Sequence, residues 1–159
     1  MSHFAEIKEM PLWSQCIGGL IINFGGTEAL TLLWIHRIAG EPAAIKSRKD
    51  TLSDRIKFVL TLIPTSKLSA SDKEKAIELW NEIKILSPIR NRIAHNPINI
   101  ARKPNSDEIV LTICDLQKMT PNSENPIQEL SYSKIGQIAL RVREINLNLD
   151  SLLKSIPEK

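Results

Sequence analysis

The sequence is poor in the residues that build the commonest catalytic and metal sites. It contains two cysteines, three histidines and only 4% aromatic residues. Cys16 and Cys114 lie far apart in the chain and form neither a Cys-x-x-Cys pair nor a disulfide framework. We therefore expect both to be reduced core thiols, which fits a cytoplasmic location.

Several well-known motifs are also missing. The sequence has no glycine-rich phosphate loop, no His-Glu-x-x-His and no Gly-x-Ser-x-Gly. These absences argue against a phosphate-loop nucleotidase, a zinc protease and a serine hydrolase of the usual type. We expect no metal ion and no cofactor.

The chain also lacks a strong charge of one sign and an uninterrupted apolar run. Its formal net charge is +3, which permits binding to a polyanion without requiring it. Polar residues interrupt the apolar stretch Leu12–Ile38 at Gln15, Asn23, Glu28 and His36. Glu6 and Glu9 stand where a secretory signal would carry basic residues. We therefore expect neither a membrane span nor a signal peptide.

The remaining composition is that of a globular domain. Hydrophobic residues make up 42% of the 159 residues and charged residues 25%, so we expect a single domain over residues 1–159. Apolar residues recur at helical spacing over 11–38, 52–63, 71–86 and about 132–156. The sequence predicts a mainly α fold, a bundle of four to five helices.

Some boundaries are ambiguous in the sequence. Residues 39–51 are interpreted as a basic loop, with Asp50 or Ser53 as the N-cap of the following helix. Ser71 and Glu74 form a capping-box pattern for the third helix. Ser87-Pro88 indicates either a kink in one long helix or the start of a new short one.

The pattern changes after the third helix. Alternating apolar residues over 98–116 predict a β-hairpin, and residues 117–130 are interpreted as a loop. Together they form an insertion over about 98–130. The last helix has a heptad-like apolar seam, which suits either a helix of the bundle or a two-chain coiled coil.

One segment combines residues suited to chemistry on phosphate: Arg90-Asn91-Arg92-Ile93-Ala94-His95. On a helix, Asn91 and His95 share a face, whereas Arg90 lies about 140° around the axis from His95. If two such helix ends met across a twofold axis, two arginines and two histidines could line one cleft.

Such a cleft could cut RNA without a metal. Histidine exchanges protons near neutral pH, so His95 could take the proton of a 2′-hydroxyl. Arginine stays charged and matches phosphate oxygens, so Arg90 could stabilise the charge that develops on them. DNA lacks the 2′-hydroxyl and would be spared.

The spacing alone is also compatible with a plain helix end, where a basic side chain near the C-terminus favours the helix dipole. Glu28 has two interpretations: it orients Arg90 or His95, or it forms a structural ion pair. Arg92, Arg102 and Lys103 are candidate RNA-binding residues, although such clusters are usually solvated surface.

The segment Arg90-Asn91-x-x-Ala94-His95 resembles the signature of the HEPN (higher eukaryotes and prokaryotes nucleotide-binding) superfamily, an arginine, four to six residues, then a histidine. The first helix, with Gly18-Gly19, Phe24 and Thr27-Glu28, is also similar to the opening helix of these proteins. The resemblance covers about residues 12–100 and, loosely, the last helix. It implies an all-helical bundle, dimers that juxtapose two motifs, and in many members metal-independent endoribonuclease activity in toxin–antitoxin or defence systems.

Carried over by position, Arg90 and His95 would be the catalytic pair and Asn91 the polar residue beside them. Pro88 and the hairpin are departures from the pattern. The expected function is a homodimeric endoribonuclease, with RNA as substrate and an antitoxin or other regulatory protein as a partner. The alternative is a non-catalytic HEPN-like module that binds a nucleotide or a protein.

Overall fold

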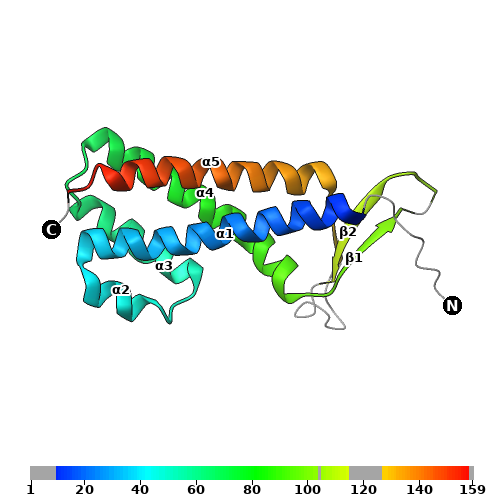
Figure 1. Ribbon diagram of the computed structural model, residues 1–159, viewed down its shortest axis with the longest axis horizontal. Coiled ribbons are helices and arrows are strands. Elements are labelled where there is room, and N and C mark those ends of the chain that lie inside the picture. The colour runs from blue at the N-terminus through cyan, green and yellow to red at the C-terminus, as the bar shows by residue number, and fades with distance from the viewer. Residues whose placement is uncertain (1–9, 104, 115–126, 158–159) are drawn as a thin grey trace. The chain divides into compact units, whose positions relative to one another are not determined.

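The computed structural model describes residues 10–103, 105–114 and 127–157. This part of the chain is mainly helical with a small antiparallel sheet, as predicted (Figure 1). The elements are α1 (Met10–Ala39), α2 (Glu41–Ser47), α3 (Leu52–Leu62), a 3₁₀ turn (Ile63–Thr65), α4 (Ala70–His95), β1 (Ile98–Arg102), β2 (Ile109–Cys114), β3 (Ile127–Ser131) and α5 (Tyr132–Lys154). Residues 117–126 of the predicted loop, residues 115–116 of the predicted hairpin and Pro104 lie outside the described residues.

The described residues divide into two compact units. Unit 1 holds those within Met1–Ile21 and Ile89–Leu140, and unit 2 those within Ile22–Pro88 and Arg141–Lys159. The division passes through α1, α4 and α5, so each of these helices contributes to both units.

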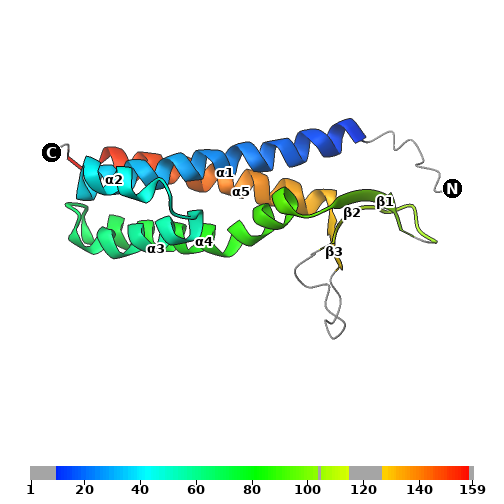
Figure 2. The same ribbon diagram turned by 90° about the horizontal axis from the view of Figure 1, so that it is seen from below.

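Unit 2 is a helical bundle with an aromatic centre. Trp34 of α1 and Trp80 of α4 are fully buried, and their rings meet edge to face with centroids 6.0 Å apart. α1 lies beside α5 in Figures 1 and 2, where Thr27 Oγ1 donates a hydrogen bond to Asn146 Oδ1 at 2.9 Å. Trp34 and Trp80 thus belong to the core of unit 2.

Helix α1 agrees with its predicted bounds to within a residue. Gly40 ends it, because its φ of 91° lies in the left-handed region that glycine adopts without strain. By length and composition α1 is the one helix among the described residues that could cross a membrane, and 28% of its most apolar window is buried. A core helix of a soluble protein passes the same test.

The prediction of a loop over 39–51 was wrong, because residues Glu41–Ser47 form α2. Pro42 sits near the start of this helix, where a missing N–H breaks no hydrogen bond. It therefore opens α2 instead of only closing α1.

The predicted start of the second helix at Leu52 is confirmed, but its predicted N-cap and the predicted start of the third helix were wrong. Thr51, not Asp50 or Ser53, caps α3, and its Oγ1 accepts a hydrogen bond from the Asp54 N–H at 3.2 Å. α4 begins at Ala70, and Ser69 Oγ accepts from the Asp72 N–H at 3.1 Å. In both cases a hydroxyl one residue before the first helical residue accepts the N–H three residues further on, which is the usual geometry of an N-cap.

Unit 1 contains the sheet, in the order β1-β2-β3 with both pairs antiparallel. The predicted hairpin over 98–116 is confirmed as β1 and β2. The predicted loop over 117–130 was wrong at its end, because Ile127–Ser131 forms β3 and pairs with β2, Leu130 opposite Leu111. β2 is thus the central strand, and Leu111 and Ile113 on it are fully buried.

The seam of α5 is buried within the single chain. The apolar residues at heptad-like spacing are all less than 10% exposed, namely Ile135, Ile138, Val142, Ile145, Leu149 and Leu152 of α5, and Ile156 just after it. This supports the bundle interpretation of the seam, because these side chains pack within the chain.

Candidate functional site

The motif residues occupy the C-terminal end of α4, in unit 1. The helix runs without interruption to His95, and Asn96-Pro97 follows its end. The sequence alternatives at Ser87-Pro88 are therefore settled: Pro88 lies inside one long helix.

Ser87 explains how α4 tolerates this proline. Pro88 has no N–H, so the carbonyl of Lys84, four residues earlier, loses its usual donor. Ser87 is buried, and its Oγ donates a hydrogen bond to the Lys84 carbonyl oxygen at 3.2 Å. The serine hydroxyl supplies the hydrogen-bond donor that the proline lacks, so the helix continues through the motif.

Arg90 and Asn91 contact each other directly. Arg90 Nη1 donates to Asn91 Oδ1 at 3.0 Å. Arg90 is half-buried, whereas Asn91 and His95 are exposed. Asn91 and His95 are four residues apart on the helix and so share a face. The structure thus places an imidazole, an amide and a guanidinium at one accessible helix end.

Arg92 is held in place by the sheet. Its Nη1 donates to Gln128 Oε1 of β3 at 2.5 Å, and Asn96 Nδ2 donates to the Arg92 carbonyl oxygen at 3.1 Å. The first bond joins the last turn of α4 to β3, and the second is a local bond at the end of the helix. Arg92 therefore acts first as a structural link between α4 and β3.

The two other candidate RNA-binding residues face carboxylates. Arg102 forms an ion pair with Asp107 across the hairpin. Lys103 Nζ lies 3.0 Å from Glu108 and 3.3 Å from Glu129, and its hydrogen bonds to these carboxylates raise its pKa. The positive charge of both side chains is thus locally compensated.

Glu28 lies in unit 2 and forms an ion pair with Arg55 of α3. Arg55 Nη2 and Glu28 Oε2 are 3.4 Å apart, and the Arg55 side chain is 8% exposed. A buried guanidinium needs such a partner. The contact corresponds to the structural interpretation of Glu28.

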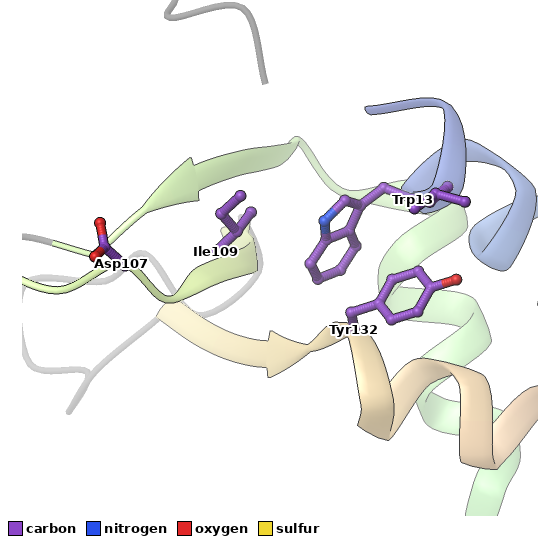
Figure 3. A pocket seen from close by; sticks show the side chains of 5 residues that line it. Trp13, Asp107, Ile109 and Tyr132 are labelled. Carbon is purple, nitrogen blue, oxygen red and sulfur yellow. The ribbon is translucent and has the colours of Figure 1, made fainter. Parts of the chain in front are cut away.

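A small cavity in unit 1 was not predicted from the sequence. It has a volume of about 250 Å³ and is lined by Leu12, Trp13, Asp107, Ile109 and Tyr132. Figure 3 shows the rings of Trp13 and Tyr132 approaching edge to face, with centroids 5.4 Å apart. No local pattern joins these segments, because they are far apart in the sequence.

Two further features bear on chemistry. In the ranges that the structure describes, no three side chains of the metal-ligating types His, Cys, Asp and Glu gather at one place. Cys16 and Cys114 are not joined in a disulfide, and both are half-buried, not fully buried as expected of core thiols; burial raises the pKa of the Cys16 thiol.

Comparison with known proteins identifies no relative: no family model, no curated protein and no solved structure matches this chain.

Proposed function

We propose that this chain is a metal-independent endoribonuclease of the HEPN type that acts as a homodimer, with Arg90 and His95 as the catalytic pair. The observation that supports it is the grouping of Arg90, Asn91 and an exposed His95 at one helix end. The roles of the two residues and the expected activity come from the resemblance of this segment to the HEPN signature.

The reaction needs a proton acceptor, a proton donor and a stabiliser of charge. A neutral His95 takes the proton of the 2′-hydroxyl, whose oxygen attacks the phosphorus atom. The bond from phosphorus to the 5′-oxygen breaks, and the protonated His95 of a second copy gives that oxygen a proton. Arg90 binds the phosphate oxygens as their charge increases. The products are a 2′,3′-cyclic phosphate and a 5′-hydroxyl.

The helix geometry supports the proposal of a dimer. Arg90 and His95 lie about 140° apart around the axis of α4. The two side chains of one chain therefore leave the helix in different directions, and we propose that two motif ends together complete the site. We place the enzyme in the cytoplasm, as a toxin or defence nuclease under the control of a partner protein.

The test is cleavage of a labelled RNA by the purified chain in the presence of EDTA. We expect cleavage that survives chelation and falls about 100-fold or more in Arg90→Ala and in His95→Ala. Matched controls are His36→Ala and Arg143→Ala, which remove an exposed histidine and an exposed arginine elsewhere. No cleavage, or equal cleavage by all variants, contradicts the proposal. A toxin would also slow growth when expressed, and His95→Ala would not.

One observation favours the alternative of a non-catalytic binding module. Arg92, Arg102 and Lys103 are all engaged by neighbouring side chains, so little uncompensated positive charge surrounds the motif. In that case His95 is a basic residue stabilised by the helix C-terminus. RNA binding without cleavage, unchanged in His95→Ala, would support this module.

A further inference from the structure

One edge of the sheet in unit 1 is open. β1 is an edge strand, and no strand lies beyond it in the part of the chain that the structure describes. Its register with β2 is continuous over Ile98–Arg102, without a bulge, and this segment contains no proline and no lysine. Apart from its short length and the charge of Arg102, β1 lacks the features by which edge strands avoid pairing with another chain.

The hydrogen bonds at the two ends of β1 show which backbone groups face outward. The Cys114 N–H donates to the Pro97 carbonyl oxygen at 3.1 Å, and the Lys103 N–H donates to the Glu108 carbonyl oxygen at 2.9 Å. Pro97 and Lys103 therefore face β2. Since every second residue of an antiparallel strand bonds to the same neighbour, the odd-numbered residues between them face β2 as well.

The even-numbered residues of β1 consequently point their backbone groups away from β2. They are Ile98, Ile100 and Arg102, and each presents an N–H and a C=O group at the open edge. These pairs of donor and acceptor repeat at every second residue, about 7 Å apart. The backbone of another extended chain matches this repeat.

The side chains of β1 show what such a chain would cover. Ile98 is paired with Ile113, and Ile100 is paired with Leu111. Paired residues of an antiparallel ladder have their side chains on the same face of the sheet. Leu111 and Ile113 are fully buried, whereas Ile98 is 40% exposed. The apolar face of the sheet thus extends beyond the part that is buried within the described chain.

We propose that β1 binds an extended segment of a partner protein, which lies antiparallel to β1 and places apolar residues opposite Ile98 and Ile100. Main-chain hydrogen bonds supply the affinity, and the alternate apolar side chains supply the specificity. Arg102 and Lys103 at the far end of β1 are already paired with carboxylates, so the segment needs no charge of its own. The motif residues of α4 take no part, so the interaction does not depend on RNA cleavage.

Two features favour a partner segment at β1 over other arrangements. Two copies of β1 paired over their full length place Ile98 opposite Arg102 at both ends, an apolar residue against a charged one. At the other edge of the sheet, Glu129 lies in the middle of β3 and forms an ion pair with Lys103. A charged side chain on an edge strand discourages the addition of another strand.

Amide hydrogen exchange of the full chain tests whether the edge is open. The N–H groups of Ile100 and Arg102 should exchange fast in the free chain, and that of Ala101, which faces β2, at least about tenfold more slowly. If Ile100 and Arg102 are already protected, another segment of the chain or a second copy occupies the edge, and the proposal is overturned.

The probe for binding is a peptide with blocked ends, Val-Thr-Val-Thr-Val-Thr-Val, in two N-methylated forms. Methylation of the threonine nitrogens leaves the valine N–H groups free, so the valines pair with Ile98 and Ile100 on the apolar face of the sheet. Methylation of the valine nitrogens pairs the threonines instead and turns the valines to the opposite face. By fluorescence anisotropy we expect the threonine-methylated peptide to bind at least about tenfold more tightly. No binding of either peptide, or an equal or reversed preference, overturns the proposal.

Proline substitutions provide matched variants of the chain. Ile100→Pro removes an N–H that points away from β2, so the ladder between β1 and β2 keeps its hydrogen bonds. It should weaken binding of the threonine-methylated peptide about tenfold or more, whereas Ile100→Val should change it by at most about threefold. Glu129→Pro, at the middle of the other edge strand, should bind as the wild type does, and equal effects of the two prolines overturn the assignment to β1. Since the two peptides are compared on the wild type, they decide the question even if Ile100→Pro does not fold.

Discussion

Arg92 Nη1 donates a hydrogen bond to Gln128 Oε1 at 2.5 Å and so ties the end of the motif helix to β3. The two residues come from segments that are distant in the sequence. The arginine that follows the motif asparagine is thus a structural residue of unit 1, and the sheet supports the last turn of α4.

This link predicts a measurable coupling between the two side chains. A double-mutant cycle of Arg92→Ala and Gln128→Ala should give a coupling free energy of about 1 kcal/mol in urea unfolding, because the bond is partly shielded from water. The same cycle on the exposed pair Arg102 and Asp107 is the control and should give a smaller value. Additive effects at Arg92 and Gln128 would show that the bond contributes nothing.

The second prediction concerns Ser87 and Pro88. Ser87→Ala should lower the free energy of unfolding by about 1 kcal/mol, because the Lys84 carbonyl loses its donor. In a Pro88→Ala background the backbone N–H at residue 88 returns, so the same substitution should have little effect. The measurement is chemical denaturation of the wild type, Ser87→Ala, Pro88→Ala and the double variant. Equal losses from Ser87→Ala in both backgrounds would contradict the compensation.

The third prediction is a pH dependence. Arg141 donates two hydrogen bonds of 2.7 Å to Glu82 and thereby lowers the pKa of that carboxyl below its ordinary value of 4.5. The ionised form is thus favoured in the folded state. Its contribution to stability is complete above pH 4.5 and is lost as the pH falls through the depressed pKa.

Thermal unfolding measured at a series of pH values from 6 downwards tests this. The lowest pH of the series is the last one at which unfolding is still reversible. Glu82→Gln and Arg141→Gln should each weaken the acid dependence of the melting temperature, since either change removes the ionised pair. The expected difference is small, because both side chains are more than a third exposed. If the melting temperature of Glu82→Gln falls with pH as steeply as that of the wild type, the Glu82–Arg141 pair does not cause the acid dependence.

The fourth prediction separates a structural role of Glu28 from a catalytic one. Glu28→Ala leaves the buried guanidinium of Arg55 without this partner and should destabilise the fold by roughly 1–2 kcal/mol. Arg55→Met in the same background should recover part of the loss. RNA cleavage at a temperature well below unfolding should be unchanged. A large loss of cleavage with normal stability would instead give Glu28 a role at the motif.

The fifth prediction rests on the proposed nuclease. Asn91→Ala removes the acceptor that holds Arg90 Nη1 and should lower kcat/KM for RNA about tenfold, less than Arg90→Ala. Asn91→Asp keeps an oxygen acceptor and should recover part of the rate. If Asn91→Ala has no effect on cleavage, the contact does not position Arg90.

Much of the helical architecture could be predicted because its signals are local. The apolar spacing of α1 and α5 defines both helices, and Asn96-Pro97 defines the end of α4. The motif could be assigned to a helix end for the same reason. Candidate side chains follow from such patterns whenever one element carries all of them.

The errors arose where neighbouring signals were chemically equivalent. Thr51, Ser53 and Asp50 are all good N-caps, and only the position of the buried stripe selects Thr51. α2 is too short to show a clear period. β3 is visible only through its pairing with β2, since five residues of mixed character predict little alone.

Contacts between distant segments could not be predicted at all. Thr27 with Asn146, Glu28 with Arg55 and Trp13 with Tyr132 join residues that no sequence window contains together. The structural role of Arg92 is of this kind, because its partner Gln128 lies in a segment that was interpreted as a loop.

The ion pairs of the hairpin also determine how an RNA complex would respond to salt. Each phosphate that a protein neutralises releases condensed counterions, and the affinity falls with ionic strength by a slope of about 0.7 per phosphate on a single strand. Arg102 and Lys103 are already neutralised by Asp107, Glu108 and Glu129. These two residues would therefore displace few counterions from RNA phosphates, and the affinity for RNA at the end of α4 would depend only weakly on salt. If the proposed nuclease is correct, recognition there would rest on the fit of a few donors to one phosphate and not on long-range attraction.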